Sequence, residues 1–149
     1  MPFPATRIIP TGWSAHHQPA LVTSMNAYCV ISDPTRTVPG AWNNETGTRG
    51  PDTPYVVYPA PGSDEAAAPC RVQRLQSATD NMQAGQSVTE RPYLVTIPAD
   101  APLIEQGYVV DFTAAINDPH LAGGRVYVAD VMSGSERFER DLVCTQNQG

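Results

Sequence analysis

Apolar and polar residues alternate in three consecutive runs in the last third of the chain. The runs are Tyr108–Thr113, Arg125–Met132 and Arg137–Thr145, and the turn-forming residues Gly123-Gly124 and Ser133-Gly134-Ser135 precede the second and third runs. A period of two residues places successive side chains on opposite faces of a strand. Glycine and serine between such runs are typical of tight turns. The pattern therefore predicts three consecutive antiparallel strands.

Shorter apolar runs earlier in the chain predict further strands. These runs are Asn26–Ser32, Tyr55–Tyr58, Cys70–Gln76 and Pro92–Ile97. Six or seven strands around one core favour closure of the sheet, because closure removes exposed strand edges. The expected fold is mainly β: a small antiparallel β-barrel of six or seven strands with long loops and a short N-terminal helix.

The N-terminal region carries weaker signals. Thr6–Ile9 can form a short edge strand. Thr11 is a suitable N-cap for a helix over Gly12–Gln18, which Pro19 is expected to end. Two helical turns are too short to be stable alone. We therefore expect this helix to pack on its own barrel or on a neighbouring subunit, with Trp13 as the anchor.

The chain divides into an N-terminal arm with a short helix, residues 1–25, and a single β-barrel domain, residues 26–149. A Pro- and Gly-rich loop insertion over residues 33–69 interrupts the barrel, and only Tyr55–Tyr58 within it has a strand pattern. Loops of this length are usually functional or clamped by a partner. Trp42 in this insertion is either a local packing anchor or an interface hot spot.

Three details of the barrel follow from the pattern. Arg140 interrupts the apolar face of the last strand, so we expect it at a rim or paired with an acid. Leu103 and Ile104 are expected to fill the core from the link before the three C-terminal strands. The polar segment Ser77–Thr89 is expected to form an exposed hairpin tip.

Charge narrows the choice of partners. The net charge is −6, and all nine basic residues are arginine. No cluster of arginines forms a stripe, which argues against a face that binds phosphate groups.

The opening residues contain prolines where a secretory leader needs an apolar helical run, and no run reaches the roughly 20 apolar residues of a membrane span. We expect a product made in the cytoplasm and not associated with a membrane.

The three cysteines, Cys29, Cys70 and Cys144, each lie in an apolar run and lack metal-ligand spacing. Free cysteine packs as a small hydrophobic residue, so three reduced, partly buried thiols are favoured. One disulfide with one free thiol stays open as an alternative, but it requires an oxidising compartment.

The remaining candidates for chemistry are weak. His16 and His17 are adjacent, so on a helix they point in different directions and are poor metal co-ligands. His120 follows Asp118 by two residues but has no identifiable partners. The strand carboxylates Asp111, Asp130 and Asp141 are interpreted as outward residues of the barrel.

No motif for a nucleotide, a metal or a nucleophile is present. The Ser133-Gly134-Ser135 turn lacks the G-x-S-x-G pattern of a nucleophile elbow, and there is no P-loop, dinucleotide fingerprint, H-E-x-x-H or EF-hand loop. We therefore predict that the chain is not an enzyme and uses no cofactor and no metal.

Three segments carry a family resemblance. They are RIIPTGWSAHHQP (Arg7–Pro19), the stretch Glu90–Val110 that ends in GYVV, and Asn117–Cys144, which contains DPHLAGGR and RDLVC. In this order they resemble the opening and closing parts of small head-to-tail connector (stopper) proteins of long-tailed bacteriophages of actinobacteria. The resemblance covers about half of the chain, and none of its elements is a catalytic motif.

The resemblance implies a structural role in the virion neck, with assembly in the host cytoplasm. Such a β-barrel forms a homo-oligomeric ring, sixfold or twelvefold, below the portal and adaptor proteins and above the tail terminator or tail tube. The ring seals the DNA exit channel, retains packaged double-stranded DNA without sequence specificity and provides the platform for tail attachment. An acidic, lysine-free subunit fits this role because it would let DNA slide.

Two sets of interface residues follow as hypotheses. The first 18 residues would dock on the adaptor, through Arg7, Ile8, Trp13, His16 and His17. Loops would contact neighbouring subunits or face the channel through Trp42, Asn43, Asn44, Asn81, Met82 and Gln83. The alternatives are a tail terminator or other neck ring protein and, from a different class, a monomeric β-sandwich binding module with an exposed aromatic platform.

Overall fold

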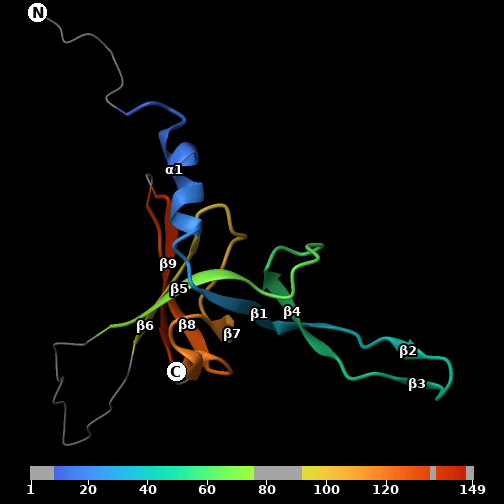
Figure 1. Cartoon of the computed structure of the whole chain (residues 1–149). Helices are drawn as coiled ribbons and strands as arrows, with labels where there is room; N and C mark the ends of the chain where they lie inside the picture. Colours follow the sequence, from blue (N-terminus) through green and yellow to red (C-terminus); the bar gives the residue numbers. More distant parts are fainter. Residues whose placement is uncertain (1–8, 76–91, 135–136, 147–149) are drawn as a thin grey trace, which may run out of the picture.

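The computed structural model describes residues 9–75, 92–134 and 137–146. In these residues the chain forms one α-helix, nine strands and one short 3-10 helix. Most strands wrap around a common core, and the helix and a strand ribbon project from it in different directions (Figure 1). The expected hairpin tip Ser77–Thr89 lies outside the described residues, as does most of the expected edge strand Thr6–Ile9.

The helix α1 spans Trp13–Val22, and the 3-10 helix η1 spans Pro119–Leu121. The strands, in chain order, are β1 (Ala27–Val38), β2 (Trp42–Asn43), β3 (Thr48–Arg49), β4 (Thr53–Tyr58), β5 (Ala68–Arg74), β6 (Tyr93–Pro98), β7 (Val109–Ala115), β8 (Arg125–Met132) and β9 (Glu139–Thr145).

The main sheet closes on itself. Six strands follow one another in the order β1-β5-β6-β9-β8-β7, and β7 pairs again with β1, with Cys29 opposite Phe112. Every pairing is antiparallel. The expected antiparallel β-barrel is therefore confirmed, and the single closed sheet differs from the two packed sheets of a β-sandwich. The seventh strand, β4, pairs with the outer half of β1.

Side chains at alternate strand positions fill the interior. The largest fully buried ones are Phe112, Ile31, Ile97, Ile104, Leu142, Val95, Val110 and Val128. Ile104 closes one end of the barrel with 2% of its surface exposed, as expected. Leu103 is 71% exposed, so its expected place in the core is wrong. The two residues are adjacent in an extended link, where neighbouring side chains point in opposite directions.

Arg140 lies on β9 and is held by backbone carbonyls. Its Nη1 donates to the carbonyls of Ala101 and Pro102 at 3.1 and 2.8 Å, and its Nη2 donates to that of Ala99 at 3.2 Å. We expected Arg140 at a rim or paired with an acid. It is half-buried, and its described partners are three carbonyls of the link between β6 and Ile104 and no acid.

The helix is longer than expected. It passes through Pro19 and ends at Val22, and its N-cap is Gly12 in place of Thr11. A proline inside a helix removes the hydrogen bond to the carbonyl four residues earlier. That carbonyl belongs to Ala15, which is exposed, so water can satisfy it. The expected end of the helix at Pro19 is therefore wrong. No described helix is both long and apolar enough to cross a bilayer.

The insertion over residues 33–69 is more regular than expected. The strand β1 continues to Val38, and β4 runs back beside it, so the first part of the insertion is a two-stranded ribbon. Two prolines fit this ribbon without the loss of a hydrogen bond between its strands. Pro34 lies where the register between β1 and β4 shifts, and Pro54 lies on β4, an edge strand, where an amide hydrogen is not needed.

Candidate docking surfaces

The ribbon that projects from the barrel is called the arm and comprises residues 34–55 (Figure 1). Its base is ordered by Asp33, which is 5% exposed. The Asp33 carboxylate accepts hydrogen bonds from the Thr35 amide and hydroxyl at 2.9 and 2.7 Å, and the hydroxyl bond is the main cause that lowers the pKa of Asp33. Further along β1, the Arg36 guanidinium lies 3.9 Å from the centre of the Tyr55 ring on β4. The Asp33 bonds fix the bend of β1 at the base of the arm, and the Arg36–Tyr55 contact joins β1 to β4 there.

The middle of the arm depends on two glycines. A Cβ atom added to Gly40 would lie 2.1 Å from the carbonyl oxygen of Gly50, so no other residue fits there without movement of the backbone. The Gly50 amide donates to the Ala41 carbonyl at 2.9 Å, and the Gly40 amide donates to the Asp52 carboxylate at 3.2 Å. The strands therefore approach more closely here than side chains would allow.

The tip of the arm is formed by β2, β3 and the turn between them. Trp42 pairs across the ribbon with Arg49, and Asn43 pairs with Thr48. The Asn43 carboxamide oxygen accepts hydrogen bonds from the backbone amides of Glu45 and Thr46, and these bonds close the tip. Trp42 is 63% exposed, so its interpretation as a local packing anchor is wrong. Asn43 and the adjacent Asn44 are also exposed. An exposed tryptophan at the end of an ordered ribbon is typical of an interface anchor.

The second candidate surface lies on α1. The Trp13 ring lies 4.9 Å from that of Phe138 and 4.5 Å from that of His17, between ring centres. The His16 and His17 rings are 5.2 Å apart. Trp13 is nevertheless 40% exposed, and none of the ten helix residues is buried. Among the described residues the helix packs against its own barrel through the Trp13–Phe138 contact and a few contacts with β6, and none of its residues is buried.

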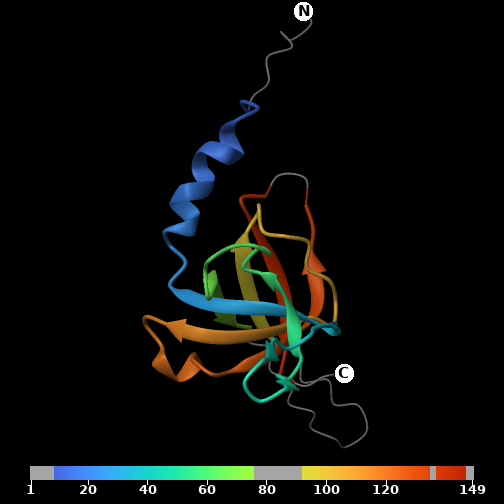
Figure 2. The same ribbon diagram turned by 90° about the vertical axis from the view of Figure 1, so that its right-hand side faces the viewer.

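The structure does not bring the two predicted sets of interface residues together. Both views show α1 rising from the barrel, and Figure 1 shows the arm leaving the barrel in a different direction (Figures 1 and 2). Trp13, His16 and His17 therefore belong to one surface, and Trp42, Asn43 and Asn44 to another. The other predicted interface residues, Arg7, Ile8, Asn81, Met82 and Gln83, lie outside the described residues.

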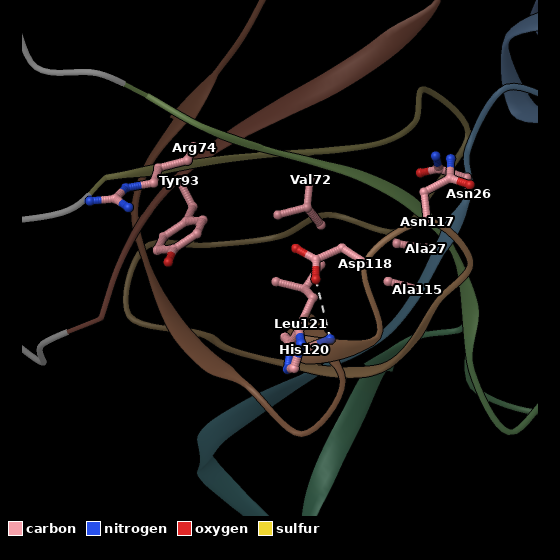
Figure 3. Close-up of a pocket in the computed structure, with 10 residues that line it drawn as sticks. All are labelled: Asn26, Ala27, Val72, Arg74, Tyr93, Ala115, Asn117, Asp118, His120 and Leu121. Carbon is pink, nitrogen blue, oxygen red and sulfur yellow. Dashed lines mark hydrogen bonds between the residues drawn. The ribbon is translucent and has the colours of Figure 1, made fainter.

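An open hollow of about 460 Å³ lies where β5, β6 and the segment around η1 meet (Figure 3). Arg74 and Tyr93 stand at one end and Asn117 at the other. The Asp118 carboxylate accepts the His120 backbone amide at 3.2 Å, so it caps η1. The Asp118–His120 pair is thus part of a turn, and it offers no acid–base geometry.

The strand carboxylates have separate local partners. Asp111 forms a bidentate ion pair with Arg125, with a shortest distance of 2.6 Å, and Asp141 binds Arg137 at 3.0 Å. Asp130 accepts a hydrogen bond from the next backbone amide. Among residues 9–75, 92–134 and 137–146, no group of three or more His, Cys, Asp or Glu side chains is arranged to hold a metal ion. The absence of enzymatic activity stays a prediction.

The three cysteines are free and fully buried in the barrel, which confirms the preferred prediction of reduced thiols and shows that they are more deeply buried than expected. Burial raises the pKa of Cys144 to about 12. A side-chain hydrogen bond with Cys70, followed by burial, raises the pKa of Cys29 well above its ordinary value. Thiols with such pKa values are protonated and unreactive near neutral pH.

One surface feature was missed from the sequence. Residues 59–66 form a small hollow with the outer faces of β1 and β4. The signal available was the segment PAPGSDE, in which apolar turn residues precede two acids. The sequence alone does not show that Val30 and Val56 lie beneath this segment.

A family model described as "Family of unknown function (DUF6093)" matches residues 17–145. No curated protein and no solved structure matches the chain. The family match covers both the barrel and the arm, and its description assigns no activity or partner.

Proposed function

This chain belongs to DUF6093, a family of unknown function, and we propose that it is a structural subunit of the neck of long-tailed bacteriophages. In this role copies of the chain form a ring below the portal and adaptor proteins. The ring closes the DNA exit channel of the head and receives the tail.

The observation that carries this proposal is the arm. It is an ordered ribbon, held by Asp33 at its base and by the Gly40–Gly50 approach in its middle, yet Trp42 at its tip is 63% exposed. Fixing each residue of such a ribbon costs about 1–2 kcal/mol of conformational entropy. The ribbon contacts little of its own barrel, and we take its order as an indication that a partner binds it. A subunit of a closed ring needs such extensions to reach its neighbours.

Three further features support the proposal. The helix α1 has no buried residue and presents Trp13 beside two histidines, as a docking segment for a ring above would. The net charge of −6 repels DNA that slides through a channel. The segments Glu90–Val110 and Asn117–Cys144 resemble those of head-to-tail stopper proteins.

Deletion of the coding sequence from the phage that encodes the chain tests the proposal. We expect packaged heads that lose DNA and do not join to tails, and restoration by the full chain supplied in trans. A matched variant replaces residues 42–49 with Asn-Gly, which forms a tight hairpin between Ala41 and Gly50, a pair already linked by a 2.9 Å hydrogen bond. This variant should fold but should not restore tail joining.

Infectious tailed particles from the deletion strain would refute the proposal. An electron cryo-microscopy map of complemented particles distinguishes the related neck roles. Density for the chain between the adaptor and the tail terminator corresponds to a stopper, whereas density at the end of the tail tube corresponds to a terminator.

A further inference from the structure

The hollow formed by residues 59–66 is a site on the outer surface of the barrel whose lining is partly apolar and partly polar. Its lining includes Val30 of β1, Val56 of β4, and Pro59, Pro61 and Ala66 of the segment between β4 and β5. Its volume is about 230 Å³. Pockets for drug-sized ligands have volumes of about 300–1,000 Å³, so this one suits a single large side chain better than a free ligand.

The rim of this hollow is acidic. Glu65 lines it, and Asp64 precedes Glu65 in the chain; both are exposed. Among the described ion pairs neither carboxylate has a cationic partner. An occupant that combines a large apolar side chain with a neighbouring positive charge would therefore complement the site in both shape and charge.

The tip of the arm has this combination. Trp42 and Arg49 are directly opposite each other on β2 and β3, and directly opposed residues project from the same face of a ribbon. Trp42 is 63% exposed, and Arg49 is exposed and has no anionic partner among the described ion pairs. Tryptophan and arginine are also the side chains most enriched among interface hot spots.

The tip cannot reach the hollow of its own chain. Ser32 on β1 pairs with Val56, which lines the hollow, and Trp42 lies ten residues further along the arm. At about 3.3 Å per residue, the tip is up to roughly 30 Å from the hollow. The arm points away from the barrel (Figure 1). The occupant must therefore come from another molecule.

We propose that Trp42 of one copy inserts into the hollow of residues 59–66 of the next copy, with Arg49 placed against Glu65 and Asp64. The tip and the hollow of residues 59–66 are different patches of one copy, so the contact is heterologous and is repeated around a ring. This inference rests on the proposed ring assembly and adds the two patches through which neighbouring subunits bind.

Chemical crosslinking between subunits tests the contact. Ala41→Cys lies next to Trp42 and keeps the tryptophan, and Ala60→Cys lies in the lining of the hollow; both positions are exposed. The three native thiols are buried, so a short bismaleimide reacts at the introduced cysteines. The full chain with both substitutions should give a ladder of dimers, trimers and higher multiples. The control that pairs Ala41→Cys with Leu103→Cys, an exposed site elsewhere, should give none.

Single substitutions test the chemistry of the contact in the crosslinkable chain. Trp42→Ala should lower the yield of the ladder and weaken association at least about 30-fold, as expected for a hot spot. Arg49→Glu and Glu65→Arg should each reduce crosslinking, and their combination should restore it. Leu103→Ala, which removes another exposed apolar side chain, should have no effect.

Crosslinking is measured on the purified chain and on phage particles complemented with it. A ladder in particles that is lost with Trp42→Ala supports the contact. Incorporation of the chain into particles without a ladder overturns the contact but leaves the neck role intact. A ladder in solution from a chain that never enters particles supports the contact and refutes the neck role. Absence of both overturns both.

Discussion

Replacing Arg140 with leucine tests how one end of the barrel is closed. The guanidinium of Arg140 donates to the carbonyls of Ala99, Ala101 and Pro102, all within 3.2 Å. These carbonyls belong to the link that leads into Ile104, which is 2% exposed and fills the barrel end. Leucine keeps an apolar side chain at this position of β9, although a shorter one, and removes every donor.

The expected loss of stability follows from these bonds. A hydrogen bond that involves a charged group contributes about 1.5–3 kcal/mol. One guanidinium serves three carbonyls, and water can replace part of the interaction at the half-buried rim. We therefore expect a loss well below the sum of the three bonds, about 2–4 kcal/mol. For a chain of this size that corresponds to a decrease of about 6–15 °C in the melting temperature.

Arg125→Leu is the matched control. Arg125 also lies on a barrel strand, and it binds Asp111 at 2.6 Å, but the side chains of this pair are 59% and 38% exposed. Exposed ion pairs contribute about 0–1 kcal/mol. Urea unfolding followed by circular dichroism measures both variants. Equal losses from the two substitutions, or a loss below 1 kcal/mol for Arg140→Leu, would refute the role assigned to the carbonyl cluster.

Three further predictions concern the core and the arm. Burial raises the pKa of Cys144 to about 12, so the contribution of this thiol to stability is complete below about pH 9 and is lost as the pH rises toward 12. The melting temperature should therefore fall over this pH range, and it should fall less for Cys144→Ala. An equal alkaline loss in that variant would contradict this. Gly40→Ala places a Cβ 2.1 Å from the Gly50 carbonyl oxygen, so amide hydrogen exchange should accelerate at the tip of the arm and stay unchanged in the barrel. In the control Gly12→Ala the added Cβ meets no atom within 4 Å, so exchange rates in the arm should not change. Phe112→Ala should lower the free energy of unfolding by about 3–5 kcal/mol, and a loss below 1 kcal/mol would remove Phe112 from the centre of the core.

The C-terminal strands were predictable because each follows a two-residue period between turn residues. The strand Arg125–Met132 has the predicted bounds, and the last strand begins at Glu139, two residues later than predicted. The strand β1 was predicted to end at Ser32 but continues to Val38. That extension has little apolar character, and its pairing with β4 depends on a bulge that a local pattern does not reveal.

The candidate docking surfaces were predictable only in part. The sequence indicates that Trp13 and Trp42 are large side chains outside the predicted strands. An aromatic side chain in a loop or a short helix can be either buried or exposed, so the sequence does not decide between the two. Exposure of Trp42 depends on the arm as a whole, which keeps the tip away from the barrel. The hollow beside Glu65 depends on Val30 and Val56, which come from two other strands.

By itself the sequence determined the class of this protein and the position of most of its strands, because alternation along a strand is a local property. It also determined the acidic charge and the buried character of the thiols. The tertiary structure alone decided the closure of the barrel through β1 and β7, the carbonyl partners of Arg140 and the separation of the arm tip from the hollow. These features join residues far apart in the chain. The free energy that selects them comes from long-range contacts, which a short stretch of sequence does not reveal.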